Sequence, residues 1–199
     1  MEYPTSLKDL IESLKKLPTI GEKSAERLAF AILSMDEEDA NLFSKSIVDV
    51  KSKIKKCSIC GNITENDICN ICRSDIRDDK TICVVEDSKN IISLEKIGTY
   101  NGKYHVLNGL ISPMDGKGPD DIEINSLLKR VKTDKIEEVI IAISPTLEGE
   151  TTALYISKIL ENESVIVSRI AYGVPLGADM EYLDPMTLSM ALNNRNKIS

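Results

Sequence analysis

Residues 57–72 read CSICGNITENDICNIC, and this stretch holds four of the five cysteines of the chain. Cys57 pairs with Cys60 and Cys69 with Cys72, each pair in a Cys-x2-Cys knuckle that sets two thiolates on one side of a tight turn. Two knuckles complete the tetrahedral, all-thiolate site that Zn²⁺ prefers. An iron–sulfur cluster or four incidental cysteines are the alternatives. Four protein ligands leave no open position, so the pattern predicts a structural zinc site.

Three helices are expected before the cysteines. The apolar residues recur at helical spacing, and they comprise Leu7, Leu10, Ile11, Leu14 and Leu17, then Ala25, Leu28, Ala29, Ile32 and Leu33, and finally Leu42, Phe43, Ile47 and Val50. Ser6 is expected to cap the first helix, Pro18 to end it and Gly21 to allow the tight turn that follows. The acidic run 36–39 suits the start of the third helix.

The turn between the first two predicted helices, LPTIGEKSAERLA at residues 17–29, is a candidate phosphate-binding element. A helix that starts after such a turn leaves backbone amides free, and these amides bind a phosphate without reading bases. Lys23 and Arg27 are four residues apart and could flank that phosphate. The pattern is that of a helix-hairpin-helix, although an ordinary helical hairpin fits the same local sequence. The lysines at positions 51, 53, 55 and 56 form either a basic patch or a solvated helix end.

From residue 80 onward, short apolar runs alternate with helical patterns. The runs 82–85, 104–107, 139–143 and 165–167 are predicted strands, and 120–132, 151–160 and 184–193 are predicted helices. The run Val139–Ile143 is entirely apolar, as expected for a strand covered on both faces. Such an alternation predicts an α/β domain with a mainly parallel sheet.

Acidic residues follow two of these strands. Glu86 and Asp87 come after the first strand, and Glu148 and Glu150 come after the third. Carboxyl ends of parallel strands meet at one edge, so these acids could converge there and hold Mg²⁺. Residues 144–146 carry no acid where an Asp-x-Asp pair would be needed, so solvated loop acids or a protein-binding edge fit equally well.

Composition narrows the class of protein. The net charge is −7, so DNA binding would need a local site against a repelling background. A single histidine, His105, disfavours histidine-based catalysis, and it is expected to be a packed strand residue. Cys83 is expected to be an ordinary buried thiol. No apolar run is long enough to span a bilayer and no signal peptide is recognisable, so a cytoplasmic protein is expected.

Taken together, these segments resemble the RecR family over nearly the full chain. Residues 17–29 resemble its helix-hairpin-helix, the four cysteines its zinc finger, and the segments 82–87, 104–107, 112–119 and 145–152 its Toprim domain. Residues 169–182 resemble its C-terminal segment. Three positions depart from the family pattern. Thr19 stands where glycine is usual, and threonine tolerates positive φ poorly; Ser144 replaces asparagine and Ala178 replaces glycine.

The resemblance implies a zinc-bearing, DNA-binding recombination mediator that assembles into rings, typically tetramers. Such proteins act with RecO, and in some contexts RecF, to load RecA onto single-stranded gaps. It implies DNA contacts at Ile20, Gly21, Lys23, Ser24 and Arg27, and a RecO-binding edge at Glu86, Asp87 and Glu148. Toprim enzymes use a glutamate with an Asp-x-Asp pair, and only Glu86 survives here, which indicates a scaffold without turnover.

Four regions are expected, namely a helical hairpin region at 1–56, a zinc finger at 57–72, a Toprim domain at 80–175 and a C-terminal segment at 176–199. Two other functions stay open. One is a Mg²⁺-dependent Toprim nuclease. The other is a ring scaffold that contacts DNA only through RecO, because residues 1–56 hold ten basic and ten acidic side chains.

Overall fold

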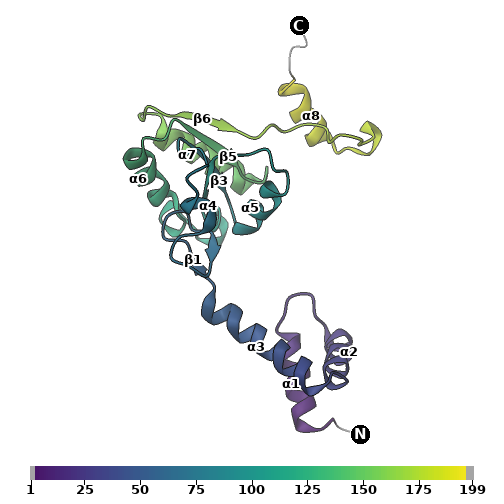
Figure 1. Cartoon of the computed structure of the whole chain (residues 1–199). Coiled ribbons are helices and arrows are strands. Elements are labelled where there is room, and N and C mark those ends of the chain that lie inside the picture. Colours follow the sequence, from purple (N-terminus) through teal and green to yellow (C-terminus); the bar gives the residue numbers. More distant parts are fainter. Residues whose placement is uncertain (1–2, 196–199) are drawn as a thin grey trace. The chain divides into compact units, whose positions relative to one another are not determined.

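The structure, a computed structural model, describes residues 3–195. The chain divides into two compact units, Met1–Ile54 and Lys55–Ser199, and each is described by itself (Figure 1). Together they form a mixed α/β protein with N-terminal helices, a four-cysteine module, a parallel four-stranded sheet and a C-terminal helix, as the sequence predicted.

Three helices make up the first unit: α1 (Thr5–Lys15), α2 (Glu22–Leu33) and α3 (Glu37–Lys53). Ala25 and Ala29 of α2 are fully buried against Ile11 of α1, because alanine lets two helix backbones approach closely. The expected first helix is confirmed, but two of its details are wrong. Ser6 lies inside the helix after an N-cap at Pro4, and Leu17 lies beyond its end.

In the turn between α1 and α2, the residue with an unusual backbone conformation is not the predicted Gly21. Gly21 is extended, with φ −88° and ψ 177°, so it could be another residue as far as backbone geometry is concerned. The left-handed residue is Thr19, with φ 69°. A β-branched side chain in this region clashes with its own backbone, so the turn carries strain at the position where the RecR pattern has glycine.

Helix α3 begins at a well-made cap, because the Asp36 carboxylate accepts a hydrogen bond of 2.8 Å from the amide of Asp39. Its apolar residues do not enter a core. Leu42, Ile47 and Val48 are all exposed, and none of the described residues of α3 is buried. The spacing therefore predicted the helix correctly but says nothing about what covers its apolar side.

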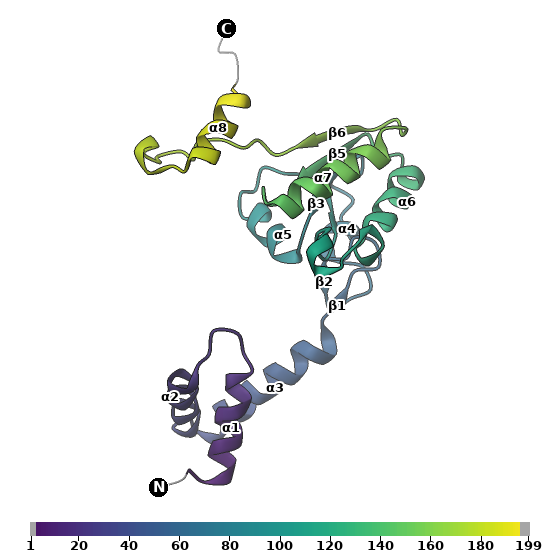
Figure 2. The same ribbon diagram turned by 180° about the vertical axis from the view of Figure 1, so that it is seen from behind.

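The second unit is built on four parallel strands in the order β4-β3-β5-β6, of which Figure 2 labels β3, β5 and β6. Their bounds are β3 Thr81–Val85, β4 Lys103–Val106, β5 Glu138–Ala142 and β6 Ile166–Arg169. Alternate residues of β3 enter two separate cores. Ile82 and Val84 pack with residues of α6 and α7, whereas Cys83 and Val85 pack with residues of α5 and β4. The central strands are thus covered on both faces, as their apolar sequence predicted.

Helices α5 (Ser88–Glu95), α6 (Ile124–Asp134) and α7 (Leu147–Leu160) cover the sheet. Two of the expected bounds are wrong. Residues 119–121 form the 3₁₀ turn η2, and Ile122 is extended, so the predicted helix at 120–132 begins only at Ile124. Helix α7 begins four residues before the predicted Thr151, because the Thr146 side chain caps it at the amide of Gly149.

Small elements complete this unit. The strands β1 (Lys55–Lys56) and β2 (Ile63–Thr64) pair with each other, α4 spans Asn70–Arg73, η1 spans Pro113–Asp115, η3 spans Met180–Tyr182, and α8 spans Pro185–Asn193 after an N-cap at Asp184. None of the helices in residues 3–195 has the length and apolar character needed to cross a membrane.

His105 and Cys83 are both buried strand residues, as predicted. The His105 Nε2 atom lies 2.8 Å from the carbonyl oxygen of Glu123, so this nitrogen carries the proton and donates it. Burial lowers the pKa of His105 to about 4, which keeps the ring neutral at physiological pH.

The strained turn gives a stability prediction. Thr19→Gly should raise the free energy of unfolding of the first unit by about 0.5–1 kcal/mol, because glycine adopts positive φ without a side-chain clash. Thermal unfolding followed by circular dichroism measures it. Ser46→Gly, inside α3, is the control and should lower stability by about 1 kcal/mol. A lower melting temperature for Thr19→Gly would show that the turn is not strained.

Candidate metal centre and nucleic-acid interface

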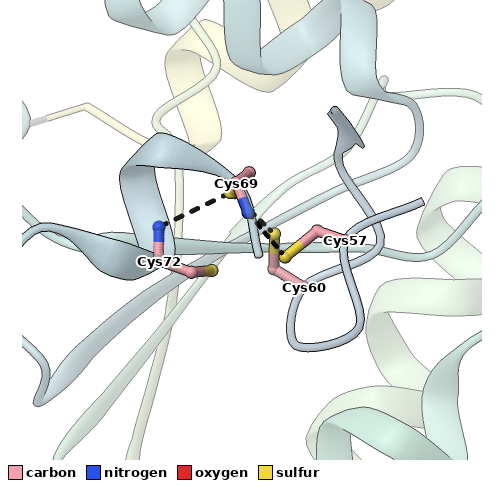
Figure 3. A group of neighbouring side chains, drawn as sticks. All are labelled: Cys57, Cys60, Cys69 and Cys72. Atoms are coloured by element: carbon pink, nitrogen blue, oxygen red, sulfur yellow. Dashed lines mark hydrogen bonds between the residues drawn. The ribbon is translucent and has the colours of Figure 1, made fainter. Parts of the chain in front are cut away.

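The four predicted ligands come together in one module at the start of the second unit. Cys57 and Cys60 belong to the turn that joins β1 and β2, whereas Cys69 is the N-cap of α4 and Cys72 lies within that helix (Figure 3). All four side chains are buried. Their sulfur atoms all lie within 4.8 Å of one another.

This geometry fits zinc. A tetrahedral ion with Zn–S bonds of ~2.3 Å needs sulfur atoms about 3.8 Å apart, and the Cys60 and Cys69 sulfurs are 3.6 Å apart. Backbone amides also point at the sulfurs, since the Cys69 amide donates to Cys57 Sγ at 3.3 Å and the Cys72 amide to Cys69 Sγ at 3.5 Å. Such N–H donors stabilise negative sulfur. The donor set is therefore that of a closed structural zinc site, as the sequence predicted.

The four thiols affect one another's ionisation because they lie so close together. Hydrogen bonds from Cys60 and Cys72 lower the pKa of the Cys69 thiol, and the pKa of the Cys60 thiol rises because it donates to Cys69. The close sulfur atoms therefore resist ionising together. A divalent cation removes this resistance, because it compensates the charge of the remaining thiolates.

Gly61 joins the first knuckle to the sheet. Its φ is 76°, in the left-handed region that favours glycine, and a Cβ atom there would lie 3.2 Å from the carbonyl oxygen of Val106. The amide of Val106, at the end of β4, donates to the carbonyl of Cys60 at 2.8 Å. The zinc module therefore covers the outer edge of β4.

The candidate DNA-binding residues lie at the start of α2 in the first unit. Gly21 is its N-cap and offers no side-chain acceptor, and the first amide of the helix with a backbone acceptor is that of Ala25, which donates to Gly21. The earlier amides are free to bind an anion. Ile20 is half-buried and packs beside the α1–α2 core, while Gly21 is exposed.

Lys23, Ser24 and Arg27 are exposed on α2, on the side away from the buried Ala25 and Ala29. Within residues 3–195, no carboxylate forms an ion pair with Lys23 or Arg27. The acid of the first turn, Glu22, is paired instead with Lys15 of α1 at 2.5 Å. This pairing reduces the repulsion that Glu22 would exert on a phosphate at the helix N-terminus.

The acidic residues predicted to lie together at the carboxyl edge of the sheet do not gather into one group among the described residues. Glu86 follows β3 and is half-buried, and Glu148 lies in the first turn of α7. The Asp87 carboxylate is already used as the N-cap of α5, where it accepts a hydrogen bond of 2.8 Å from the amide of Lys89. In the described part of the chain, the four cysteines are the only group of three or more acids, histidines or cysteines gathered as a metal site would need.

Glu150 has a partner that the sequence analysis missed. Arg169, at the end of β6, donates to Glu150 Oε2 at 2.9 Å, and its guanidinium lies 4.9 Å from the centre of the Tyr172 ring. The pair joins α7 to the last strand, and it removes Glu150 from the free acids of the edge. The residues are nineteen positions apart, so no local spacing rule could have found them.

Comparison with known proteins agrees with the order of these parts. Family models match in turn the helix-hairpin-helix of RecR at residues 7–51, the four-cysteine zinc finger domain of RecR at 54–74, a Toprim domain at 80–171, and the C-terminal part of RecR at 173–196. The chain is 51% identical over 198 residues to the recombination protein RecR of Staphylococcus aureus strains Mu3 and JH9, with 100% of both chains covered.

Zinc removal is expected to unfold the four-cysteine module. Cys60→Ser should abolish stoichiometric zinc and cost at least about 3 kcal/mol of stability, since structural zinc sites bind with apparent free energies on the order of 10 kcal/mol. Elemental analysis and thermal melting measure both effects. Cys83→Ser, a buried thiol outside the cluster, should keep its zinc. If a strong chelator removed the metal and left the melting temperature unchanged, the structural role would be wrong.

Proposed function

Because the chain belongs to the RecR family, we propose that it is a recombination mediator of DNA repair that works without catalytic turnover. Its partners are DNA and RecO, and RecF in some contexts, and its task is to promote loading of RecA onto single-stranded gaps. Its place is the cytoplasm, at the nucleoid. The observation that carries the DNA-binding part is the free N-terminus of α2 with Lys23 and Arg27 beside it.

The hairpin binds the DNA backbone rather than the bases. The free amides of α2 and the hydroxyl of Ser24 contact a phosphate, Ile20 and Gly21 shape the approach, and the cations of Lys23 and Arg27 flank it. Because the amides carry no net charge, this site tolerates the overall charge of −7. Binding of this kind is independent of sequence, as a protein that acts at any gap requires.

Self-association is part of the proposal. Phe43, Ile47 and Val50 lie on one face of α3 and are exposed, so they form an apolar surface that a second copy can cover. Repetition of such contacts gives a homo-oligomer, and a tetrameric ring built from dimers would bring several hairpins to one DNA molecule. Weak single sites would then act together.

The acidic edge of the second unit serves RecO rather than a metal ion. Glu86 and Glu148 are half-buried, and Asp87 is committed to the cap of α5. The nuclease alternative would need several carboxylates around Mg²⁺, and the loop after β5 supplies serine, proline and threonine at residues 144–146 before its first acid.

DNA binding tests the hairpin. Lys23→Ala/Arg27→Ala should weaken binding to single-stranded DNA by about tenfold or more and flatten the slope of log affinity against log salt by about 1.4, the value for two lost phosphate contacts. Fluorescence anisotropy at several salt concentrations measures both. Lys8→Ala/Lys45→Ala, which removes the same charge from exposed positions elsewhere in the unit, should change little. The oligomer mass, read in the same buffer, should be unaffected.

Equal losses in both double mutants would mean that only net charge matters and that the hairpin is not the site. If the wild-type protein does not bind DNA without RecO, the scaffold alternative replaces direct binding.

A nuclease assay separates the mediator from the enzyme. With Mg²⁺ or Mn²⁺, single- and double-stranded substrates should stay intact, because the described acids do not gather into a metal site. Cleavage that disappears in Glu86→Ala would establish the nuclease and end the mediator proposal.

A further inference from the structure

The hairpin of the first unit contains an ion pair that joins the end of α1 to the start of α2. The ammonium of Lys15, in the last turn of α1, lies 2.5 Å from a carboxylate oxygen of Glu22, the first residue of α2. The two residues stand on either side of the turn that contains Thr19 and Gly21. The ion pair therefore lies beside the backbone amides proposed to bind a phosphate.

Both charges suit the helix ends on which they lie. A cation is stabilised at the C-terminus of a helix and an anion at its N-terminus, because the peptide dipoles add along the axis. Lys15 also donates a hydrogen bond of 2.9 Å to Glu12, in the preceding turn of α1. Hydrogen bonds to Glu22 and Glu12 raise the pKa of Lys15, so its ammonium stays charged at neutral pH.

Glu22 is the acid of α2 that bears most strongly on a phosphate at the helix start. The field of a helix terminus falls off within the first turn, and Glu22 is the acid of that turn, whereas Glu26 follows one turn later. An unpaired carboxylate at this position would interact with the positive end of the helix in place of the phosphate. It would also repel the phosphate directly, since both are anions.

The charge balance at the start of α2 depends on Lys15. The stretch 22–27 holds two acids and two bases, so it has no net charge of its own. The hydroxyl of Tyr3 donates to Glu26 at 3.4 Å, but a neutral hydroxyl leaves the charge of that carboxylate in place. Lys15 brings the additional cation, and it brings that cation to the acid nearest the free amides.

We propose that Lys15 is a positioning residue of the DNA site, which neutralises Glu22 and so keeps the N-terminus of α2 open to a phosphate. This inference rests on the proposed function, because DNA bound at the hairpin is the ligand. Lys15 acts through Glu22 and does not touch the DNA. The loss of Lys15 should therefore be repaired when the charge of Glu22 is removed as well.

The test is a double-mutant cycle on the full-length protein, with binding of single-stranded DNA measured by fluorescence anisotropy at low salt. Lys15→Met removes the cation but keeps the apolar stem of the side chain, and it should weaken binding by about two- to fivefold, as expected for an unbalanced charge in the first turn of a helix. Lys15→Met/Glu22→Gln should bind as tightly as Glu22→Gln, because the carboxylate that Lys15 balances is then absent.

Lys15→Met/Asp9→Asn is the matched control. Asp9 is an exposed acid of α1 outside the hairpin turn, so this double mutant has the same net charge as Lys15→Met/Glu22→Gln. It should bind as weakly as Lys15→Met. Lys15→Arg keeps the cation and should keep the affinity. An exposed ion pair contributes little to stability, so all variants should melt within about 5 °C of the wild type.

Several results would overturn the inference. If Lys15→Met binds DNA like the wild type, the charge of Glu22 does not affect the site. If Lys15→Met/Glu22→Gln stays as weak as Lys15→Met, then Lys15 either contacts the DNA itself or only holds the turn together. If Asp9→Asn repairs binding as well as Glu22→Gln does, only net charge matters.

Failure of the proposed function gives a different pattern. A wild-type protein that does not bind DNA, or a Lys23→Ala/Arg27→Ala mutant that binds like the wild type, would remove the hairpin site and this inference with it. If Lys23→Ala/Arg27→Ala loses binding while Lys15→Met keeps it, the hairpin site stands and the role of Lys15 is wrong.

Discussion

The second unit begins with four cysteines, and its structure depends on how the mutual repulsion of their thiolates is overcome. Sulfur atoms as close as those of Cys60 and Cys69 cannot all be charged unless a cation lies among them, so a bound cation is what allows the four thiolates of residues 57–72 to share one site. Once the cation is bound, the knuckle is rigid enough to present the Cys60 carbonyl to the amide of Val106. A metal site with no role in chemistry thus fixes one border of the sheet.

The parallel sheet explains why functional groups from distant segments share an edge. Each strand returns to the same starting side through a helix, so the loops after β3, β4 and β5 open in one direction. The same connectivity buries the central strands on both faces, so packing restricts their side chains. The exposed loops are less restricted and can differ in sequence. Contacts such as that of Thr152 with Ile111 then convert separate loops into a single surface.

Much of this could be predicted from local sequence, and the failures have physical reasons. Spacing alone identified the cysteine module, and the apolar run at 139–143 identified the central strand. Periodicity found the helix at α6 but misplaced its start, because Pro119 begins a 3₁₀ turn that periodicity cannot distinguish from helix. Local sequence assigned the freedom of the turn to Gly21, and only the resemblance to the family pattern pointed to Thr19, where the positive φ lies. The ion pair of Arg169 depends on tertiary packing, which no local pattern encodes.

The two edge strands of the sheet, β4 and β6, differ in what lies beyond them, and this difference bears on how the protein would aggregate. The outer side of β4 is occupied by the first knuckle, whereas β6 has no strand beyond it among the described residues. A strand with unpaired backbone groups is a template for other chains. A molecule that lost its metal would uncover a second such template while its core stayed folded. Metal starvation would then reveal itself as aggregation of nearly intact protein rather than as simple loss of function.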